Sequence, residues 1–458
     1  MTRKVLLFSI GLLFVVAVPV FADGYAATAA LSEAVHLGEQ LPIWSVIPFI
    51  GILLSIALLP LLAPKFWHRH FVEVSAFWAI VFVFPFVLIY GGLALQEIAQ
   101  VALDYFSFIT LLAALFIISG GIHLSGDIEA KPQTNALFLL IGAVLANFIG
   151  TTGASMLLIR TVLSTNRERQ NTRHIPIFFI FLVSNIGGAL LPIGDPPLFL
   201  GYLVGVPFFW TLRLFPLWIF TVALVLLVFF VMDARAYRNE PTYAVRWDKA
   251  AIQPLRLVGK INFVWLLGVL LAAILLPLPF KEAVMWLMAL LSWVTTQREI
   301  RRRNEFTWHP IVEVAVLFAG IFATMIPCLL ILKARGGELG ITQPWQFFWA
   351  TGMLSSFLDN APTYLTYLSL GQGVTTALAL PAEIVLRDGR IAEMYLMAVS
   401  AGAVFMGANT YIGNAPNFMV RAIAQERGIH MPSFFGYMAY SICILVPIFV
   451  AVTLVFFR

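Results

Sequence analysis

The apolar run 175–205 most constrains the fold of this chain, because it is long enough to cross a lipid bilayer yet cannot form one continuous helix. Its centre, Ser184–Gly201, contains three prolines, four glycines and Asp195. The Pro-Pro pair after Asp195 disfavours helical backbone, which predicts a break near Gly194. Broken backbone at membrane depth is stable where it is buried in protein or lines a polar cavity. The run therefore predicts two half-helices that meet near mid-membrane and form a binding site.

A second interpretation of this run is a kinked helix that packs inside the protein without a role in binding. It would leave Asp195 as a charged side chain in the membrane with no function, which is costly. Asp195 could also cap the half-helix that follows it, because aspartate is favoured at helix N-termini. The sequence supports capping and ion binding by Asp195 about equally.

Composition limits the class of protein. Of 458 residues, 61% are hydrophobic and 11% are charged, which is too little polar surface for a soluble domain of this size. The sequence therefore predicts an all-α polytopic membrane protein. Its basic residues lie in short loops between apolar runs, so the net charge of +5 does not indicate nucleic-acid binding. It contains neither a phosphate-binding loop nor a His, Cys and carboxylate cluster at ligand spacing, so we expect no enzyme and no resident cofactor.

Residues 1–22 resemble a targeting segment. Arg3 and Lys4 give a basic start, and an apolar stretch with small residues follows. This pattern is typical of a secretory signal peptide, although the same residues could remain as an uncleaved first helix. In both cases we expect the following residues to begin on the outer side of a bacterial-type inner membrane.

Ten apolar runs are each long enough to span the bilayer, for which about 20 helical residues suffice. They are 43–62, 77–95, 106–122, 175–205, 210–232, 261–277, 281–296, 310–332, 393–423 and 433–457. Two further runs, 135–163 and 344–370, are interrupted halfway by polar and small residues. We expect each of these to form a re-entrant hairpin, in a chain of about 10 to 11 transmembrane helices.

The charges of the loops support this count. With both hairpins returning to their own side, most basic residues fall in loops on the inner side, in agreement with the positive-inside rule. These inner residues are Lys65, Arg69, Arg167, Arg169, Arg173, Arg235, Arg238, Arg246, Lys249, Arg256, Lys260, Arg298, Arg301, Arg302, Arg303, Arg421 and Arg427. The outer loops contain Lys281, Lys333, Arg335, Arg387 and Arg390. A hairpin that crossed the membrane once would place the following basic loops outside.

The two halves of the chain contain matching segments in the same order. Each has three spans, a hairpin, a broken span and a last span, over 43–232 and 261–457. The residues between them, 233–260, are expected to be a cytoplasmic linker. Because the first half enters the membrane from outside and the second from inside, we predict two repeats of inverted topology.

The motifs of the two halves align as well. Phe148–Thr151 matches Phe357–Asn360, and Pro192–Pro197 matches Tyr411–Pro416. Paired broken segments at corresponding positions are the strongest sequence indication of a transporter's binding site. The residues expected to break the two helices are Gly194, Pro196, Pro197, Gly413 and Pro416.

At these motifs the chain resembles the ion transporter superfamily, which includes NhaD-type Na⁺/H⁺ antiporters, ArsB-type arsenite exporters and citrate-transporter-like permeases. The resemblance rests on Ser184–Gly188, Gly194–Pro197, Leu358–Pro362 and Gly407–Pro416. It implies a scaffold domain and a moving transport domain built from the two repeats, elevator-type motion and a homodimer in the lipid bilayer.

The polar residues at the breaks indicate cation binding. An exchanger of Na⁺ and H⁺ needs a buried carboxylate that binds one ion or the other. Asp359 beside Asn360 is the first candidate, with Na⁺ as the metal ion, and Asp195 is the second. Further oxygen ligands are expected from Asn147, Thr151, Thr152, Asn185, Asn409, Thr410 and Asn414, since hard cations prefer oxygen.

Two functions stay open at this point. The first is a Na⁺/H⁺ antiporter that works by alternating access, with a small inorganic ion as its substrate. The second is a Na⁺- or H⁺-coupled carrier of an anion or oxyacid, such as citrate, another dicarboxylate or arsenite. Such a carrier would use the positive ends of half-helices to hold its substrate.

Overall fold

The computed structural model describes residues 37–250 and 252–458 of the chain. The expected signal peptide or first helix, 1–22, lies outside the described residues. The first half contains η1 (Ile43–Val46), α3 (Ile47–Leu62), α4 (Pro64–Ser119), α5 (Pro132–Thr165), α6 (His174–Leu182), η2 (Ile186–Ala189), α7 (Pro196–Leu203), η3 (Phe208–Leu214) and α8 (Phe215–Arg238). A short helix, α9 (Thr242–Ala250), follows.

The second half repeats this order of helices. It contains α10 (Asn262–Leu275), α11 (Phe280–Thr295), α12 (Arg298–Arg303), α13 (His309–Arg335), η4 (Gly336–Leu339), α14 (Pro344–Phe357), α15 (Asn360–Ala377), α16 (Glu393–Met406), η5 (Gly407–Asn409), α17 (Ala415–Glu426) and α18 (Phe434–Phe456). In both halves a pair of hairpin helices precedes a helix, a short 3-10 turn and a second helix. That the two halves are inverted in the membrane stays a prediction.

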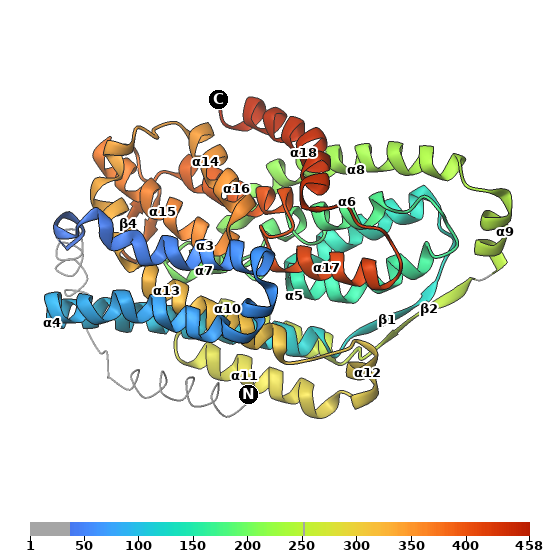
Figure 1. Cartoon of the computed structure of the whole chain (residues 1–458), viewed down its shortest axis with the longest axis horizontal. Coiled ribbons are helices and arrows are strands. Elements are labelled where there is room, and N and C mark those ends of the chain that lie inside the picture. The colour runs from blue at the N-terminus through green and yellow to red at the C-terminus, as the bar shows by residue number, and fades with distance from the viewer. Residues whose placement is uncertain (1–36, 251) are drawn as a thin grey trace.

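The expected all-α polytopic membrane protein is confirmed. Among the described residues, six segments are long and apolar enough to cross a membrane, and many of their apolar side chains face outwards. They are Ile43–Pro60, Pro64–Ser119, Pro132–Thr165, Phe208–Arg238, His309–Leu339 and Phe434–Phe456. The long helices run roughly along the long axis of the molecule (Figure 1).

Two expected spans, 77–95 and 106–122, belong to the single element α4, whose backbone leaves helical geometry at Gly91 (φ 53°, ψ −119°). The helices on either side of Gly91 are longer than the apolar runs and include polar residues before and between them. Trp67, for example, lies in the polar part and is buried in a cluster with Val316. Hydropathy marks the apolar part of a helix, so the expected spans omit polar helical residues, whereas 77–95 crosses the turn at Gly91 and 106–122 runs past the end of α4.

The segment expected as the first hairpin is α5, which has a non-helical residue at Gly150 (φ 75°, ψ 154°). Its two ends meet, because Asn135 and Asn166 donate amide hydrogen bonds to each other at 2.9 and 2.8 Å. The chain therefore reverses at Gly150, and its arms lie antiparallel. The second hairpin consists of α14 and α15 and extends to Ala377. The depth of both hairpins in a membrane stays a prediction.

Two short ladders of strands accompany the helices. β1 (His123–Asp127) pairs antiparallel with β2 (Gln253–Val258), and β3 (Ile384–Leu386) pairs with β4 (Gly389–Ile391). The expected linker thus contains the end of α8, the helix α9 and the strand β2. β1, β2, α9 and α12 gather at the right-hand end of the molecule, and β4 lies towards the left-hand end (Figure 1). The loop charges predict that the right-hand end is the cytoplasmic one.

Two groups of helices surround the candidate site, and they share one hydrophobic core. In the first group α4 and α13 are joined by hydrogen bonds from Ser75 to Val316 O (2.9 Å) and from Tyr105 to Ala315 O (2.7 Å), and by the ring contact of Phe108 with Phe318. The second group contains the hairpins α5 and α14–α15 and the short helices α6, α7, α16 and α17, with their buried faces against one another. The candidate site lies where the groups meet.

Candidate ion and substrate site

The short helices at the two breaks place one carboxylate in the centre of the protein. α6 ends at Leu182 and α7 begins at Pro196, so Asp195 stands just before a helix in extended backbone. Asn414 occupies the same position before α17. Asp195 is 1% exposed, and Asn414 donates a hydrogen bond to its Oδ1 at 3.1 Å. Two segments 219 positions apart in sequence therefore meet at one carboxylate.

The hairpin tips supply the other two donors to Asp195. Thr151 follows Gly150 in α5 and donates its hydroxyl hydrogen to Asp195 Oδ1 at 2.9 Å. Asn360 begins α15 and donates its amide to Asp195 Oδ2 at 2.6 Å. These are the residues that the two aligned hairpin motifs place at equivalent positions. Within the described residues, no Lys, Arg or His pairs with Asp195, so its charge is balanced by neutral donors alone.

Close backbone contacts fix both breaks in the same way. A Cβ on Gly194 would lie 2.3 Å from Gly188 O, and one on Gly413 would lie 2.5 Å from Gly407 O. Larger residues could not make either turn without moving the backbone. The glycines of the two motifs are thus required by the close approach of the chain to itself, and they hold Asp195 and Asn414 in place.

Several expected site residues brace the breaks. Asn147 donates its amide to Gly187 O at 2.8 Å and accepts from Leu190 N at 2.7 Å, which ties the first hairpin to the first break. Asn409 and Thr410 make the corresponding link, because both donate to Ser356 of the second hairpin. These three residues position the site and do not contact Asp195 directly.

The structure shows Asp359, and not Asp195, as the side chain that caps a helix. Asp359 accepts a hydrogen bond from Ala361 N at 3.0 Å and thereby caps α15, whereas Asp195 makes no side-chain capping bond to α7. Capping was the alternative considered for Asp195. Asn360 has a buried Oδ1 without a hydrogen-bond partner among the described residues, which leaves this oxygen for an ion or substrate.

Sequence reasoning missed Asn417 in α17. Asn185 donates its amide to Asn417 Oδ1 at 2.7 Å, and Asn417 donates to Gly407 O and Thr410 O at 2.9 Å each. Asn417 is fully buried and connects the breaks of the two halves. Its position, directly after the Ala-Pro of the second motif, is the signal that could have identified it.

The structure brings together four of the expected ligands, places two more in a cavity beside them and sets the rest behind them. Asp195, Thr151, Asn360 and Asn414 form the centre, Thr152 and Asp359 line the cavity, and Asn147, Asn185, Asn409 and Thr410 support the breaks. Of the expected break residues, Gly194, Pro196 and Pro416 also line the cavity. Ion binding by any of these residues stays a prediction.

The cavity of about 340 Å³ reaches from Asp195 towards the end of the molecule that the loop charges assign to the cytoplasm. Its lining ends at Glu305 and Glu426, which are exposed. Arg160 lines the same end and pairs with Glu305 at 2.7 Å. The centre is thus accessible from one side.

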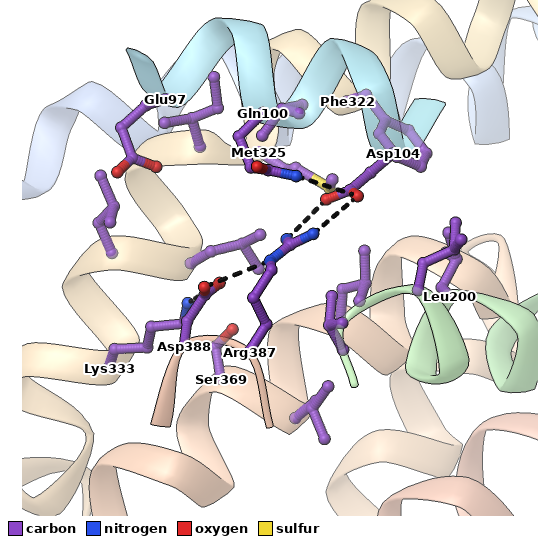
Figure 2. A pocket seen from close by; sticks show the side chains of 18 of the residues that line it. Glu97, Gln100, Asp104, Leu200, Phe322, Met325, Lys333, Ser369, Arg387 and Asp388 are labelled. Carbon is purple, nitrogen blue, oxygen red and sulfur yellow. Dashed lines mark hydrogen bonds and ion pairs between the residues drawn. The ribbon is translucent and has the colours of Figure 1, made fainter. Parts of the chain in front are cut away.

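On the opposite side, ion pairs join the β3–β4 turn to the helices α4 and α13 (Figure 2). Arg387 of the β3–β4 turn donates two hydrogen bonds to Asp104 of α4, at 2.9 and 2.7 Å. The neighbouring Asp388 pairs with Lys333 of α13 at 3.3 Å. Although burial opposes it, Lys333 and Arg387 lower the pKa of the Asp388 carboxyl, which favours the charged, paired form. The space left there is about 70 Å³.

Several helix N-termini meet at the larger cavity. The first turns of the second arm of α5 (Thr151, Thr152), of α7 (Pro196) and of α17 (Ala415, Pro416) all line it. Each such end carries a partial positive charge and unpaired N–H groups, which favour an anion. The second arm of α5 and α17 have uncharged residues at this end, so their positive ends are not neutralised by a carboxylate of their own.

Comparison with known proteins gives one match. A protein-family model described as "Putative citrate transport" matches residues 38–457. None of the curated proteins matches the chain. The matched range includes both hairpins, both breaks and every residue of the cavity. It agrees with the citrate-transporter-like part of the resemblance, whereas the likeness to NhaD-type antiporters and ArsB-type exporters stays a prediction.

Proposed function

We propose, since the chain belongs to the citrate-transport family, that this membrane transporter is a cation-coupled carrier of a carboxylate anion of the citrate class. The substrate would bind in the cavity beside Asp195 and cross the membrane by alternating access. The proposal is carried by one observation. Several helix N-termini converge on a cavity whose deep end holds the buried carboxylate of Asp195, which pairs with no cationic side chain among the described residues.

The volume and lining of the cavity support a small organic acid as substrate. A cavity of about 340 Å³ is at the lower end of the range for small-molecule sites, roughly 300–1,000 Å³. The first turns of α5's second arm and of α17 offer backbone N–H groups to carboxylates. Thr152 lies in the first of these turns and makes no side-chain hydrogen bond to another described residue, so its hydroxyl remains for substrate.

The polar centre supports a cation as the coupling species. Asp195 needs a proton or a metal ion, because three neutral donors do not offset a buried negative charge. The free Oδ1 of Asn360 adds an oxygen ligand next to this carboxylate, as Na⁺ prefers. A bound cation would also reduce the repulsion between Asp195 and an anionic substrate.

The closed outer side and open inner side support alternating access. The hairpin group would be the moving domain and the α4–α13 group the scaffold, since the cavity and the ion pairs both lie at their junction. Opening the outer side requires that the bonds from Arg387 to Asp104 and from Lys333 to Asp388 break. The structure then corresponds to an inward-open form.

Na⁺/H⁺ exchange without an organic substrate is the second candidate function. Asp195 supports both functions equally, because either one needs a buried carboxylate that binds a cation. Substrate binding separates the two. Citrate added to purified protein should raise its thermal midpoint in a saturable way, and Thr152→Val should weaken citrate binding about tenfold, the effect of losing roughly 1.4 kcal/mol. Thr376→Val, in an exposed part of α15, is the matched control. A thermal response to Na⁺ and pH with none to citrate or other carboxylates would favour the exchanger.

A further inference from the structure

Three carboxylates cluster at the predicted cytoplasmic end, remote from the transport cavity. Asp127 ends β1, Glu168 lies between α5 and α6, and Asp248 belongs to α9. One carboxylate oxygen from each lies within 4.8 Å of the others. The cluster therefore joins three segments, of which one belongs to the connection between the two halves.

The side chains are buried and incompletely hydrogen-bonded. Asp127 is 7% exposed, the side chain of Glu168 9% and Asp248 2%. Asp127 Oδ1 and Glu168 Oε2 are enclosed and have no hydrogen-bond partner in the part of the chain that the structure describes. Buried carboxylate oxygens are normally paired, because leaving one unpaired is costly. Two unpaired oxygens in one buried cluster of carboxylates indicate a positively charged ligand.

The basic residues nearby pair with groups outside the cluster, except Arg167, which pairs with one oxygen of Glu168. Arg169 pairs with Asp233 at 2.6 Å, Lys249 with Glu129 at 3.6 Å, and Arg167 with the other oxygen of Glu168 at 2.9 Å. Among the described residues none of them forms an ion pair with Asp127 or Asp248. Asp248 accepts hydrogen bonds from Ala130 N at 3.0 and 3.3 Å, one to each carboxylate oxygen, and no other donor contacts it among the described residues.

Burial and the adjacent Glu168 and Asp248 carboxylates raise the pKa of Asp127 to about 6. This is the expected consequence of gathering buried negative charges, which the nearby Arg167 offsets only in part. The geometry of the cluster, its burial and its unpaired oxygens carry the inference independently of this value.

We propose that Asp127, Glu168 and Asp248 bind a divalent cation that prefers oxygen ligands, of the Ca²⁺ and Mg²⁺ class. Carboxylates without His or Cys ligands suit such hard cations and not Zn²⁺. One oxygen from each carboxylate lies within 4.8 Å of the others, a spacing that ligands of a single ion can adopt. Ca²⁺ accepts irregular arrangements of carboxylate oxygens, whereas Mg²⁺ demands near-ideal octahedral geometry and keeps several waters. We therefore expect tighter binding of Ca²⁺ than of Mg²⁺.

A bound ion would fasten α9 to β1 and to the α5–α6 loop. The antiparallel pairing of β1 with β2 already joins these segments, with Asp127 opposite Gln253. The ion would add a second connection, which joins Asp127 of β1 to Glu168 of the α5–α6 loop and to Asp248 of α9. It would stabilise the cytoplasmic connection between the halves, and it would do so whatever substrate the transporter carries.

Terbium luminescence tests the site directly, because Tb³⁺ is an oxygen-preferring probe that nearby tryptophan sensitises, and Trp247 adjoins Asp248. Purified full-length protein in detergent should show a saturable Tb³⁺ signal that Ca²⁺ displaces at lower concentration than Mg²⁺. Asp127→Asn and Glu168→Gln should each weaken Tb³⁺ binding at least tenfold. The matched control is Glu299→Gln, since Glu299 is an exposed residue of α12 that pairs with Arg303.

Thermal stability gives a second measurement that does not depend on luminescence. Ca²⁺ should raise the thermal midpoint of the native protein and of Glu299→Gln, but not that of Asp127→Asn or Glu168→Gln. Without added metal, both cluster variants should be at least as stable as the native protein, because each removes one of three repelling charges. Absence of saturable Tb³⁺ binding, or unchanged binding in both cluster variants, would overturn the proposal.

Discussion

Asp195 accepts hydrogen bonds from Thr151, Asn360 and Asn414, one residue from each of three separate segments. At the scale of single residues this arrangement explains why an aspartate can occupy the middle of an apolar protein. The donors hold its two oxygens in fixed directions, and a coupling cation would complete their environment. Asp359, by contrast, satisfies the first turn of α15.

This difference predicts the order of two neutralising variants. Hydrogen bonds to a charged group contribute about 1.5–3 kcal/mol each, so Asp195→Asn should lower cation-driven uptake about ten- to a hundredfold. Asp359→Asn should reduce it less, because an asparagine can still cap α15. Initial uptake rates in proteoliposomes with matched protein content measure both. A larger loss in Asp359→Asn would instead support the sequence-based choice of Asp359 as the principal ion ligand.

Capping by Asp359 makes a separate prediction about stability. Asp359→Ala removes the bond to Ala361 N and should cost about 1 kcal/mol, whereas Asp359→Asn should cost little. Thermal unfolding of the purified variants in one detergent compares them. Equal midpoints for the alanine and asparagine variants would contradict the capping role.

At the scale of elements, two glycines allow the chain to change direction where a side chain would be strained. Gly91 divides α4 and Gly150 divides α5, and both have positive φ. A Cβ on Gly91 would meet no atom within 4 Å, so a substitution there tests backbone conformation without a steric clash.

Gly91→Ala should therefore destabilise the protein by about 1–3 kcal/mol, the cost of holding a non-glycine residue in a forbidden region. The adjacent Gly92 is the matched control, because it also has open space around its Cα but lies in the helix with negative φ. Gly92→Ala should be neutral or stabilising by up to about 1 kcal/mol. Thermal unfolding of the two variants decides, and equal midpoints would mean that the turn at Gly91 is not a conformational requirement.

The ion pairs of the β3–β4 turn predict how the outer side opens. Arg387→Met should weaken the closed form by about 1 kcal/mol and so raise the open population roughly fivefold. A cysteine at Ser369, which lines the outer space, reports this opening through its rate of labelling when Cys443 is replaced by Ser. Arg390→Met is the control, because Arg390 is exposed on the same turn. Labelling that is no faster in Arg387→Met than in this control would contradict the role of these ion pairs.

Most of the site could be predicted from sequence because its signals are local. Proline and glycine breaks next to polar residues indicated Asp195, Asn414 and the hairpin tips. The cap at Asp359 and the buried Asn417 were not predicted, since their roles depend on partners brought close by the fold. Hydropathy likewise could not indicate the helical polar part of α4 or the pairing of β1 with β2, because these rest on tertiary contacts.

At the scale of the whole molecule, the inner cavity and the outer ion pairs occupy opposite ends of one junction between two groups of helices. An inverted pair of repeats provides two exchangeable ways of packing these groups, and hence two access states. The sidedness of the loops, a homodimer and a bacterial-type inner membrane stay predictions.

Cysteine labelling tests the sidedness. Trp247 of α9 and Val385 of β3 are 71% and 61% exposed. β3 pairs with β4, and α9 and β4 lie at opposite ends of the molecule (Figure 1). In sealed cells an impermeant thiol reagent should label Val385→Cys and leave Trp247→Cys unlabelled until the membrane is opened, with Cys443 replaced by Ser in both. Labelling of both from outside would contradict the inverted arrangement.

The most direct measurement of the central claim is the accumulation of labelled citrate in proteoliposomes under an imposed Na⁺ or H⁺ gradient. The native protein should accumulate citrate above its external concentration, accumulation should stop when the gradient is collapsed, and Asp195→Asn should abolish the dependence on the gradient. Gradient-driven Na⁺/H⁺ exchange without uptake of citrate or any other carboxylate would contradict the account.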